Sequence, residues 1–374
     1  MRFQTTPDNL QAGISTVQRA VAPKSPLAIL SGILFEFAPG TATLTGSNMD
    51  LTISRTIPVI PVTGDCQASV VLPTKQLAEV VRRLSDSPLV LTIDPVTNST
   101  ELSYGQGRVR LNGFDPAEYP RPVEPEEPQI EFQAPCDVFQ ALFRRVLYAV
   151  GQDELRPVFT GVLLEIEGDQ VRAVATDAHR LALNQVAFPG GAGTEVRVII
   201  SGRALSELVR ILAQTEEEKF RMALAENHVS FTVGPTKLLS RVINGNYPDY
   251  RRVIPTSFQA RITGLDAMLL LRTVERAATL AQDTSPVVNF QLENGLLRIT
   301  AQSDTGAAWE EIPVDFEGEA QEVSFNAKYL EDALRWCETS ALVLELNGPV
   351  GPAIFRPVSD TDHYLALVLP VRLF

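Results

Sequence analysis

Cysteine is scarce in this sequence, since Cys66, Cys136 and Cys337 are the only ones among 374 residues. They lie far apart and form no Cys-x-x-Cys pair, which argues against a disulfide framework and against a zinc site. We therefore expect a protein of the reducing cytoplasm, with no metal and no other cofactor. Long apolar runs are also lacking. No segment approaches the ~20 apolar residues of a membrane span, and the residues after Arg2 lack the apolar stretch of a secretory signal.

Positive charge is in deficit, because 32 Lys and Arg stand against 45 Asp and Glu, which gives a formal net charge of −13. Phosphate binding depends on Lys and Arg, so the total charge would normally argue against a nucleic-acid partner, but the distribution of the charges matters more than their sum. Apolar residues, by contrast, make up 45% of the chain, which is ample for globular cores. The length exceeds the size at which one hydrophobic core stops growing, and predicts two or three domains.

A strand followed by a helix recurs three times in the chain. Residues 197–212, RVIISGRALSELVRIL, read as a β-branched strand that turns into an amphipathic helix at Ser201-Gly202. Residues 69–84 and 322–337 have the same design. Each helix carries a basic, an acidic and a basic residue at i, i+4 and i+7, and the intervals are 128 residues (203 − 75) and 125 residues (328 − 203). The three stripes are Lys75, Glu79 and Arg82; Arg203, Glu207 and Arg210; Lys328, Asp332 and Arg335.

Another helix is expected near the start of each copy, and each ends close to an arginine: Arg19, Arg145 or Arg272. Apolar residues at helical spacing predict the buried faces. These faces are Leu10, Ile14, Val17 and Val21 in the first copy; Phe139, Leu142, Phe143, Val146 and Val150 in the second; Leu265, Leu269, Val274 and Ala277 in the third.

Strands fill the rest of each copy as a three-strand meander and a closing run of strands, with period-two alternation and turn residues such as Pro39-Gly40 and Asn294-Gly295. The sequence therefore predicts an α+β fold of three repeated domains, each with two helices on antiparallel sheets. We place the domains at residues 1–122, 128–254 and 255–374, separated by the Pro- and Glu-rich stretch 121–128 and by the segment near 253–257.

Asp177 and His179 are the one pair in the sequence that suggests catalysis, as a general base and its orienting acid. A hydrolase on a β-rich scaffold is therefore an alternative function, and a triplicated scaffold that never meets DNA is another. No nucleophile elbow, Walker loop or HExxH motif accompanies the pair, so we favour a non-catalytic protein. The apolar C-terminal tail, residues 365–374, either closes the last sheet as an edge strand or borders a groove that partners use.

With these residues laid out, the whole chain resembles the bacterial DNA polymerase III beta subunit family. The resemblance is most specific at TDAHRLAL (176–183), YPDYRRVIP (247–255), SFNAKYLEDAL (324–334) and VLPVRL (368–373). It implies a processivity factor in which two three-domain subunits join head to tail as a homodimer. The six domains would form a ring around double-stranded DNA, with the helices lining the hole. The implied partners are a clamp loader complex, the replicative polymerase alpha subunit, and translesion polymerases and repair proteins that carry clamp-binding peptides.

The resemblance also implies functional residues. A peptide groove between domains 2 and 3 would contain Phe159, Thr176, Ala178, His179, Arg180, Leu181, Pro248, Arg252, Val253, Asn326, Tyr329, Val350, Pro352, Val368, Leu369, Pro370, Val371, Arg372 and Leu373. DNA would face Lys24, Lys75, Arg82, Arg203 and Gln152, to which the repeat adds Arg19, Arg145 and Arg272. The dimer interface would join Arg108 and Val109 to Thr279 and Leu280. Ala178, Ser285 and Phe374 depart from the family pattern and affect which peptides fit.

Overall fold

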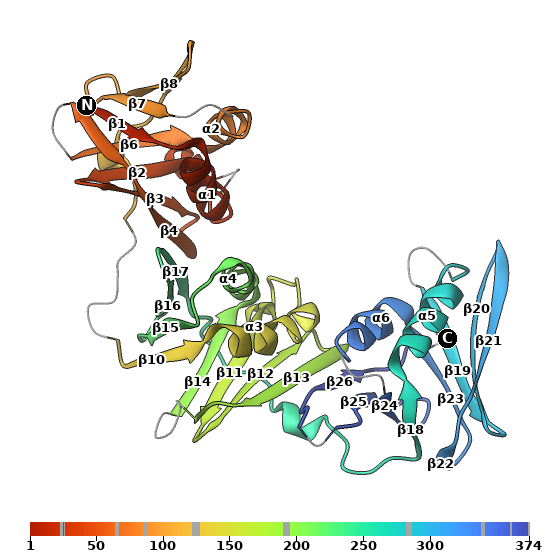
Figure 1. Ribbon diagram of the computed structural model, residues 1–374. Helices are drawn as coiled ribbons and strands as arrows, with labels where there is room; N and C mark the ends of the chain where they lie inside the picture. Colours follow the sequence, from red (N-terminus) through yellow and green to blue (C-terminus); the bar gives the residue numbers. More distant parts are fainter. Residues whose placement is uncertain are drawn as a thin grey trace. The chain divides into compact units, whose positions relative to one another are not determined.

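The computed structural model describes residues 1–22, 25, 27–63, 67–84, 88–121, 128–189, 195–281, 286–337, 341–359 and 361–372 (Figure 1). They form two compact units. One consists of Met1–Asp137 with Glu207–Val242, and the other of Val138–Ser206 with Ile243–Phe374. No helix in the described part of the chain is long and apolar enough to cross a membrane.

The first unit contains two antiparallel sheets. Its smaller sheet has five strands in the order β5 (Ile60–Thr63), β1 (Arg2–Thr5), β7 (Leu89–Asp94), β8 (Ser99–Tyr104) and β9 (Gly107–Asn112). Its larger sheet has eight strands in the order β10 (Ile130–Pro135), β15 (Lys219–Leu224), β16 (His228–Val233), β17 (Thr236–Arg241), β4 (Leu51–Pro58), β3 (Thr41–Ser47), β2 (Gly32–Ala38) and β6 (Ala68–Pro73). The helices α1 (Pro7–Val17) and α2 (Thr74–Val81) lie side by side in this unit (Figure 1).

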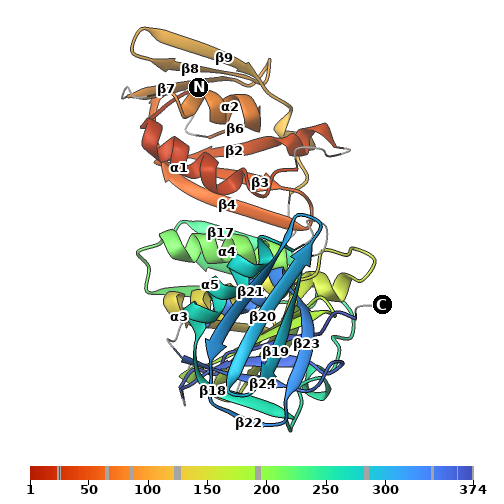
Figure 2. The same cartoon turned by 90° about the vertical axis from the view of Figure 1, so that its right-hand side faces the viewer.

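The second unit repeats this plan. Nine strands form one sheet in the order β14 (Glu195–Ser201), β11 (Gly161–Glu167), β12 (Gln170–Thr176), β13 (Arg180–Ala187), β26 (Leu365–Val368), β25 (Ala353–Pro357), β24 (Ala341–Leu346), β18 (Ala260–Asp266) and β22 (Phe316–Gly318). Four long strands, side by side in Figure 2, form the other sheet in the order β21 (Gly306–Pro313), β20 (Leu296–Ser303), β19 (Val287–Glu293) and β23 (Gln321–Asn326). The helices α5 (Ala267–Ala278) and α6 (Ala327–Arg335) pack against each other.

The remaining helices are α3 (Cys136–Arg144) and α4 (Gly202–Gln214), and both cross the border between the two units. Helix α4 follows β14 directly at Ser201-Gly202, where the sequence predicts the change from strand to helix. Helices α2 and α6 follow β6 and β23 in the same way. The threefold recurrence of a strand that turns into a helix is therefore confirmed.

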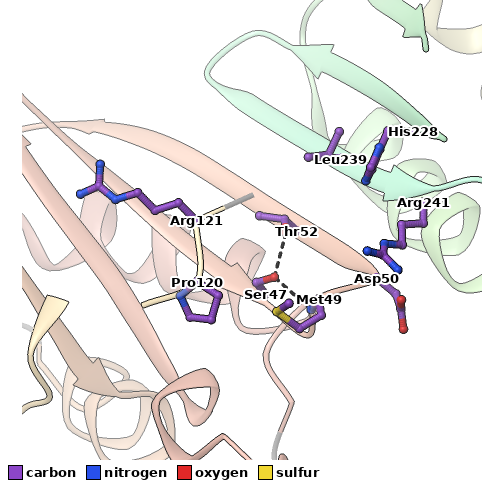
Figure 3. A pocket seen from close by; sticks show the side chains of 9 residues that line it. All are labelled: Ser47, Met49, Asp50, Thr52, Pro120, Arg121, His228, Leu239 and Arg241. Carbon is purple, nitrogen blue, oxygen red and sulfur yellow. Dashed lines mark hydrogen bonds between the residues drawn. The ribbon is translucent and has the colours of Figure 1, made fainter. Parts of the chain in front are cut away.

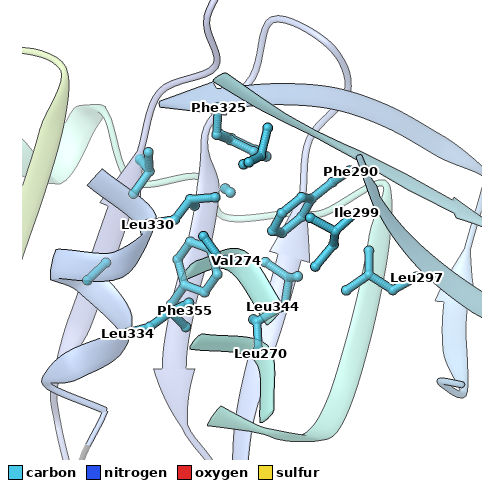
Figure 4. Packing of buried hydrophobic residues seen from close by; sticks show 14 of the residues in the cluster. Leu270, Val274, Phe290, Leu297, Ile299, Phe325, Leu330, Leu334, Leu344 and Phe355 are labelled. Atoms are coloured by element: carbon cyan, nitrogen blue, oxygen red, sulfur yellow. The ribbon is translucent and has the colours of Figure 1, made fainter. Parts of the chain in front are cut away.

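The core of the third copy lies between its two helices and its two sheets (Figure 4). Leu270 and Val274 from α5 and Leu330 and Leu334 from α6 are at most 2% exposed. Each such side chain contributes about 1.5–3 kcal/mol to folding. The prediction that Leu269 belongs to this buried face is wrong, because it is 44% exposed and the adjacent Leu270 points into the core instead.

The larger sheets join successive copies of the repeat. In the first unit, the third meander strand of copy one, β4, pairs with the last closing strand of copy two, β17. In the second unit, β13 of copy two pairs in the same antiparallel manner with β26 of copy three. The corresponding third meander strand of copy three is β21, and the last closing strand of copy one is β9. Each of them lies at the edge of its sheet.

Candidate functional site

The turn between β12 and β13 carries the TDAHRL motif and has a fixed shape. The Asp177 Oδ1 atom accepts hydrogen bonds from the backbone N–H groups of His179, at 2.9 Å, and Arg180, at 3.0 Å. The Ala178 N–H donates to the Thr176 hydroxyl at 3.2 Å. Ala178 has a φ of 77°, a conformation that favours glycine because a Cβ atom is strained there. The Asp177 carboxylate therefore holds the turn, as expected for an Asx turn.

Arg180 joins this turn to α6. Its guanidinium contacts the Asp177 carboxylate at 3.0 Å and the Asp332 carboxylate at 2.6 Å. It also lies over the ring of Tyr329, 4.5 Å from the centroid. Burial alone would lower the pKa of Arg180, but its hydrogen bond to Asp332 and the charges of both carboxylates outweigh burial and raise it. Arg180 thus stays charged and fixes copy two against copy three.

His179 and the chain after β26 also contact this junction. The His179 ring stacks on Tyr329 with the centroids 6.4 Å apart. The His179 carbonyl accepts a hydrogen bond from the Leu369 N–H at 2.9 Å, and the Ser324 carbonyl accepts one from the Val371 N–H at 2.8 Å. These bonds place the apolar tail beside the TDAHRL turn.

The YPDYRRVIP motif anchors the segment after β17 to the nine-stranded sheet. The buried Tyr247 hydroxyl donates to the Val174 carbonyl at 3.2 Å. The Tyr250 hydroxyl donates to the Glu165 carboxylate at 2.7 Å, and burial together with this bond raises the pKa of Tyr250 to about 12. Both rings pack in an apolar cluster with Leu367 of β26. The motif therefore positions Pro248, Arg252 and Val253 near the same strands.

The residues implied for the peptide groove differ in accessibility. Val350, Val253 and Leu369 are 68%, 53% and 36% exposed. Thr176, Leu181 and Val368 are buried, so their side chains lie beneath the surface rather than on it. Leu373, Ser285 and Phe374 lie outside the described residues. Of the others, Ala178, His179, Pro248, Arg252 and Arg372 are exposed, and Phe159, Arg180, Asn326, Tyr329, Pro352, Pro370 and Val371 are half-buried.

One residue expected to face DNA does not. The prediction for Arg145 is wrong, because this side chain is 9% exposed and forms an ion pair with Asp362 at 2.7 Å. Its guanidinium also donates to the Trp336 carbonyl at 3.0 Å and 3.2 Å. Lys24 lies outside the described residues, and Arg19, Lys75, Arg82, Gln152, Arg203 and Arg272 are exposed.

The acidic residues of the three helix stripes are ion-paired. Glu79 pairs with Arg82 at 3.0 Å, Glu207 with Arg19 at 3.7 Å, and Asp332 with Arg180 at 2.6 Å. Each acid is thus compensated by an arginine, and the stripes retain a surplus of basic groups in an acidic chain.

The residues implied for the dimer interface lie in or near the two edge strands β9 and β21. Arg108 and Val109 belong to β9, and Thr279 and Leu280 follow α5. Leu280 lies beside the start of β21, 3.7 Å from the position that a Cβ atom would take at Gly306. Trp309 on β21, which the sequence analysis does not name, is 72% exposed. Alignment of the third meander strands of the three copies would have identified it.

Comparison with known proteins identifies the family. Models of the N-terminal, central and C-terminal domains of the DNA polymerase III beta subunit match residues 1–123, 133–249 and 251–372. The chain belongs to the DNA polymerase III beta subunit family. The Staphylococcus epidermidis beta sliding clamp is 30% identical over the full length of both chains.

Solved structures of this family have the same fold. The DNA polymerase sliding clamp of Bacillus subtilis is 30% identical, covers 100% of both chains and superposes with a TM-score of 0.92. The Pseudomonas aeruginosa sliding clamp bound to griselimycin is 25% identical over 100% of both chains, with a TM-score of 0.91. Membership of this family gives the chain the function of a sliding clamp, a non-catalytic processivity factor of a DNA polymerase.

Proposed function

We propose that two copies of this chain join head to tail in the cytoplasm and close a ring around duplex DNA. The observation that supports this is the pair of edge strands. Where one copy of the repeat meets the next inside the chain, a third meander strand pairs with a last closing strand. Strands β21 and β9 are the same two kinds of strand, and each ends a sheet. An open edge favours pairing with another chain. If β21 of each subunit pairs with β9 of the other, the two contacts close a dimer.

The two internal junctions suggest a register for this contact. Ile53 of β4 lies opposite Leu238 of β17, and Ala182 of β13 lies opposite Ala366 of β26. All four side chains are buried on the side of the sheets that the helices cover. The repeat spacing makes Ala308 of β21 the counterpart of Ile53 and Ala182.

The strand β9 supplies the other half of the register. Val109 lies opposite the buried Leu102, as Leu238 lies opposite the buried Phe231. Val109 is therefore the counterpart of Leu238, and Ala308 should lie opposite Val109 of the second subunit. This register brings the exposed Trp309 opposite Arg108, a combination that favours a cation–π contact.

Cysteine cross-linking tests this proposal. The double variant Ala308→Cys with Val109→Cys should form a disulfide-linked dimer in a mild oxidant, because directly opposed residues have Cβ atoms about 4.5–5.5 Å apart. The matched control, Ala308→Cys with Arg108→Cys, moves one thiol to the other face of β9 and should cross-link poorly. Equal cross-linking of both pairs, or of neither, would contradict the register.

A comparison of circular with linear DNA tests whether the protein encircles its DNA. The protein, loaded on nicked circular DNA, should remain bound through gel filtration and should dissociate when the circle is linearised. Dissociation from both forms at equal rates would instead indicate an ordinary binding protein, and would exclude encirclement.

We propose that Lys75, Arg82 and Arg203 face the DNA phosphates. Each phosphate contact adds about 0.9 to the slope of log affinity against log salt. The triple variant with alanine at these positions should therefore reduce this slope for a short duplex by about 2–3. An unchanged slope would remove these residues from the interface.

The exposed residues around the TDAHRL turn and the tail support a peptide groove for polymerases, the clamp loader and repair proteins. Two or three buried anchors at about 1.5–3 kcal/mol each, less the cost of association, suggest roughly micromolar affinity. His179→Ala should weaken binding of a peptide that carries Gln, Leu and Phe, without changing the dimer. His363→Ala, a change at another exposed histidine, is the control. Equal effects of the two variants would argue against this groove.

A further inference from the structure

A cavity of about 140 Å³ opens where β4 and β17 meet, in the first unit (Figure 3). It lies between the turn before β4, the chain that leads out of copy one, and the hairpin of β16 and β17. The residues that matter for its chemistry are Met49, Asp50, Pro120, His228, Leu239 and Arg241.

The turn beside this cavity has the same structure as the TDAHRL turn. Asn48 Oδ1 accepts backbone hydrogen bonds at 3.1 Å and 2.8 Å, as Asp177 Oδ1 does at 2.9 Å and 3.0 Å. Met49, like Ala178, has positive φ, 80° against 77°. Both turns therefore present the same backbone shape at the start of a third meander strand.

The surroundings of the two turns also correspond. The Arg241 N–H donates to the Asp50 carbonyl at 3.0 Å, as the Leu369 N–H donates to the His179 carbonyl at 2.9 Å. The residue before Pro120 is Tyr119, and its hydroxyl donates to the Thr45 carbonyl at 3.4 Å. Tyr247, which precedes Pro248, donates to the Val174 carbonyl at 3.2 Å. The cavity thus occupies in the first unit the place that the candidate groove occupies in the second.

The cavity and the candidate groove differ in chemistry at one lining residue. Arg241 stands where the groove has the apolar Leu369. In the described part of the chain, no carboxylate lies within ion-pair distance of Arg241, whereas the nearby Arg121 pairs with Glu36 at 3.0 Å. Figure 3 shows the Asp50 carboxylate turned away from the Arg241 guanidinium. Among the described residues, Arg241 therefore presents a positive charge without an acidic partner, beside an apolar floor.

We propose that this cavity is a second peptide site, which binds an acidic side chain next to an apolar one in a partner protein. The carboxylate would pair with Arg241, and the apolar side chain would contact Leu239, Met49 and Pro120. A DNA backbone fits less well, because it has no apolar group for this floor. The choice of a peptide as occupant rests on the peptide groove proposed above.

Methyl NMR tests the proposal at the site itself. The chain has 4 methionines, of which Met49 lines the cavity and Met268, in the other unit, has a similar exposure. Acetyl-Glu-Leu-Phe-amide, added to protein labelled with 13C at the methionine methyl groups, should shift the Met49 signal and leave Met268 unchanged. Acetyl-Gln-Leu-Phe-amide should bind there about fivefold more weakly, as expected for the loss of one exposed ion pair.

Variants separate this site from the groove. Arg241→Gln should abolish the preference for the Glu peptide, whereas Arg210→Gln removes the same charge from helix α4 and should preserve it. Leu369→Glu should impair the groove yet leave the Met49 response intact, so the two proposals can fail separately. Equal shifts of Met49 with both peptides, or none with either, would overturn the proposal. So would a Met49 shift caused by a short DNA duplex and abolished by Arg241→Gln, without a response to the peptides.

Discussion

Arg145 should stabilise the fold rather than bind DNA, and its loss is expected to be costly. The guanidinium donates two hydrogen bonds to the Asp362 carboxylate, at 2.7 Å and 2.8 Å, and lies 4.8 Å from the centroid of the Tyr364 ring. It also donates to the Trp336 carbonyl. Arg145 directly follows α3 in copy two, but all of these partners belong to copy three.

The expected loss of folding stability follows from the unpaired Asp362 carboxylate that Arg145→Met leaves behind. Removal of one partner from a buried ion pair costs about 3–5 kcal/mol, because the other charge is left uncompensated. Asp362 is 17% exposed, so water partly solvates the orphaned carboxylate and the expected loss is about 3 kcal/mol. The double variant Arg145→Met with Asp362→Leu leaves no buried charge and should recover at least half of this loss.

Urea unfolding, followed by circular dichroism, measures the effect. The midpoint for Arg145→Met should fall by on the order of 1 M. Arg144→Met, a change at the exposed neighbouring arginine, is the control and should shift the midpoint much less. Without urea, and at a temperature where both proteins are folded, Arg145→Met and the parent protein should bind a short duplex with the same affinity. A stable Arg145→Met variant with a smaller salt slope for DNA would refute the reasoning and restore Arg145 to the DNA interface.

Three other variants test local features of the fold. Ala178→Gly should raise the free energy of unfolding by about 1 kcal/mol in urea titrations, because glycine relieves the positive φ; a loss of stability would contradict this. Gly46→Ala should lower it by more than about 2 kcal/mol, since the new Cβ atom would lie 2.3 Å from the Val17 carbonyl oxygen; an unchanged midpoint would show that α1 can move away freely. Burial, and then the charge of Arg241, lowers the pKa of His228 below 6.5. The unfolded chain therefore binds this proton first, and stability should fall as the pH drops below 6.5; Arg241→Gln should raise the pKa of His228 in an NMR titration, and no change would exclude this contact.

The repeat made much of the architecture predictable. Apolar residues at helical spacing identified the buried faces of α1 and α3, and Ser201-Gly202 marked the start of α4, because local periodicity and turn chemistry are written in consecutive residues. The face of α5 was misjudged by one position. Leu269 and Leu270 are adjacent and equally apolar, so only the packing against β20 and β19 decides which one is buried.

The sequence could not predict features that depend on contacts between distant segments of the chain. Arg19, Arg145 and Arg272 hold equivalent places in the repeat, yet Arg145 alone of the three is buried, because Asp362 and the Trp336 carbonyl approach it from a copy about 200 residues later in the chain. The sequence by itself determined three equivalent modules and the residues that belong to each. The tertiary structure decided which strands of one module pair with the next, and therefore which edges and cavities remain for partners. Such pairings bring together groups far apart in the chain, and no local pattern encodes the distance between them.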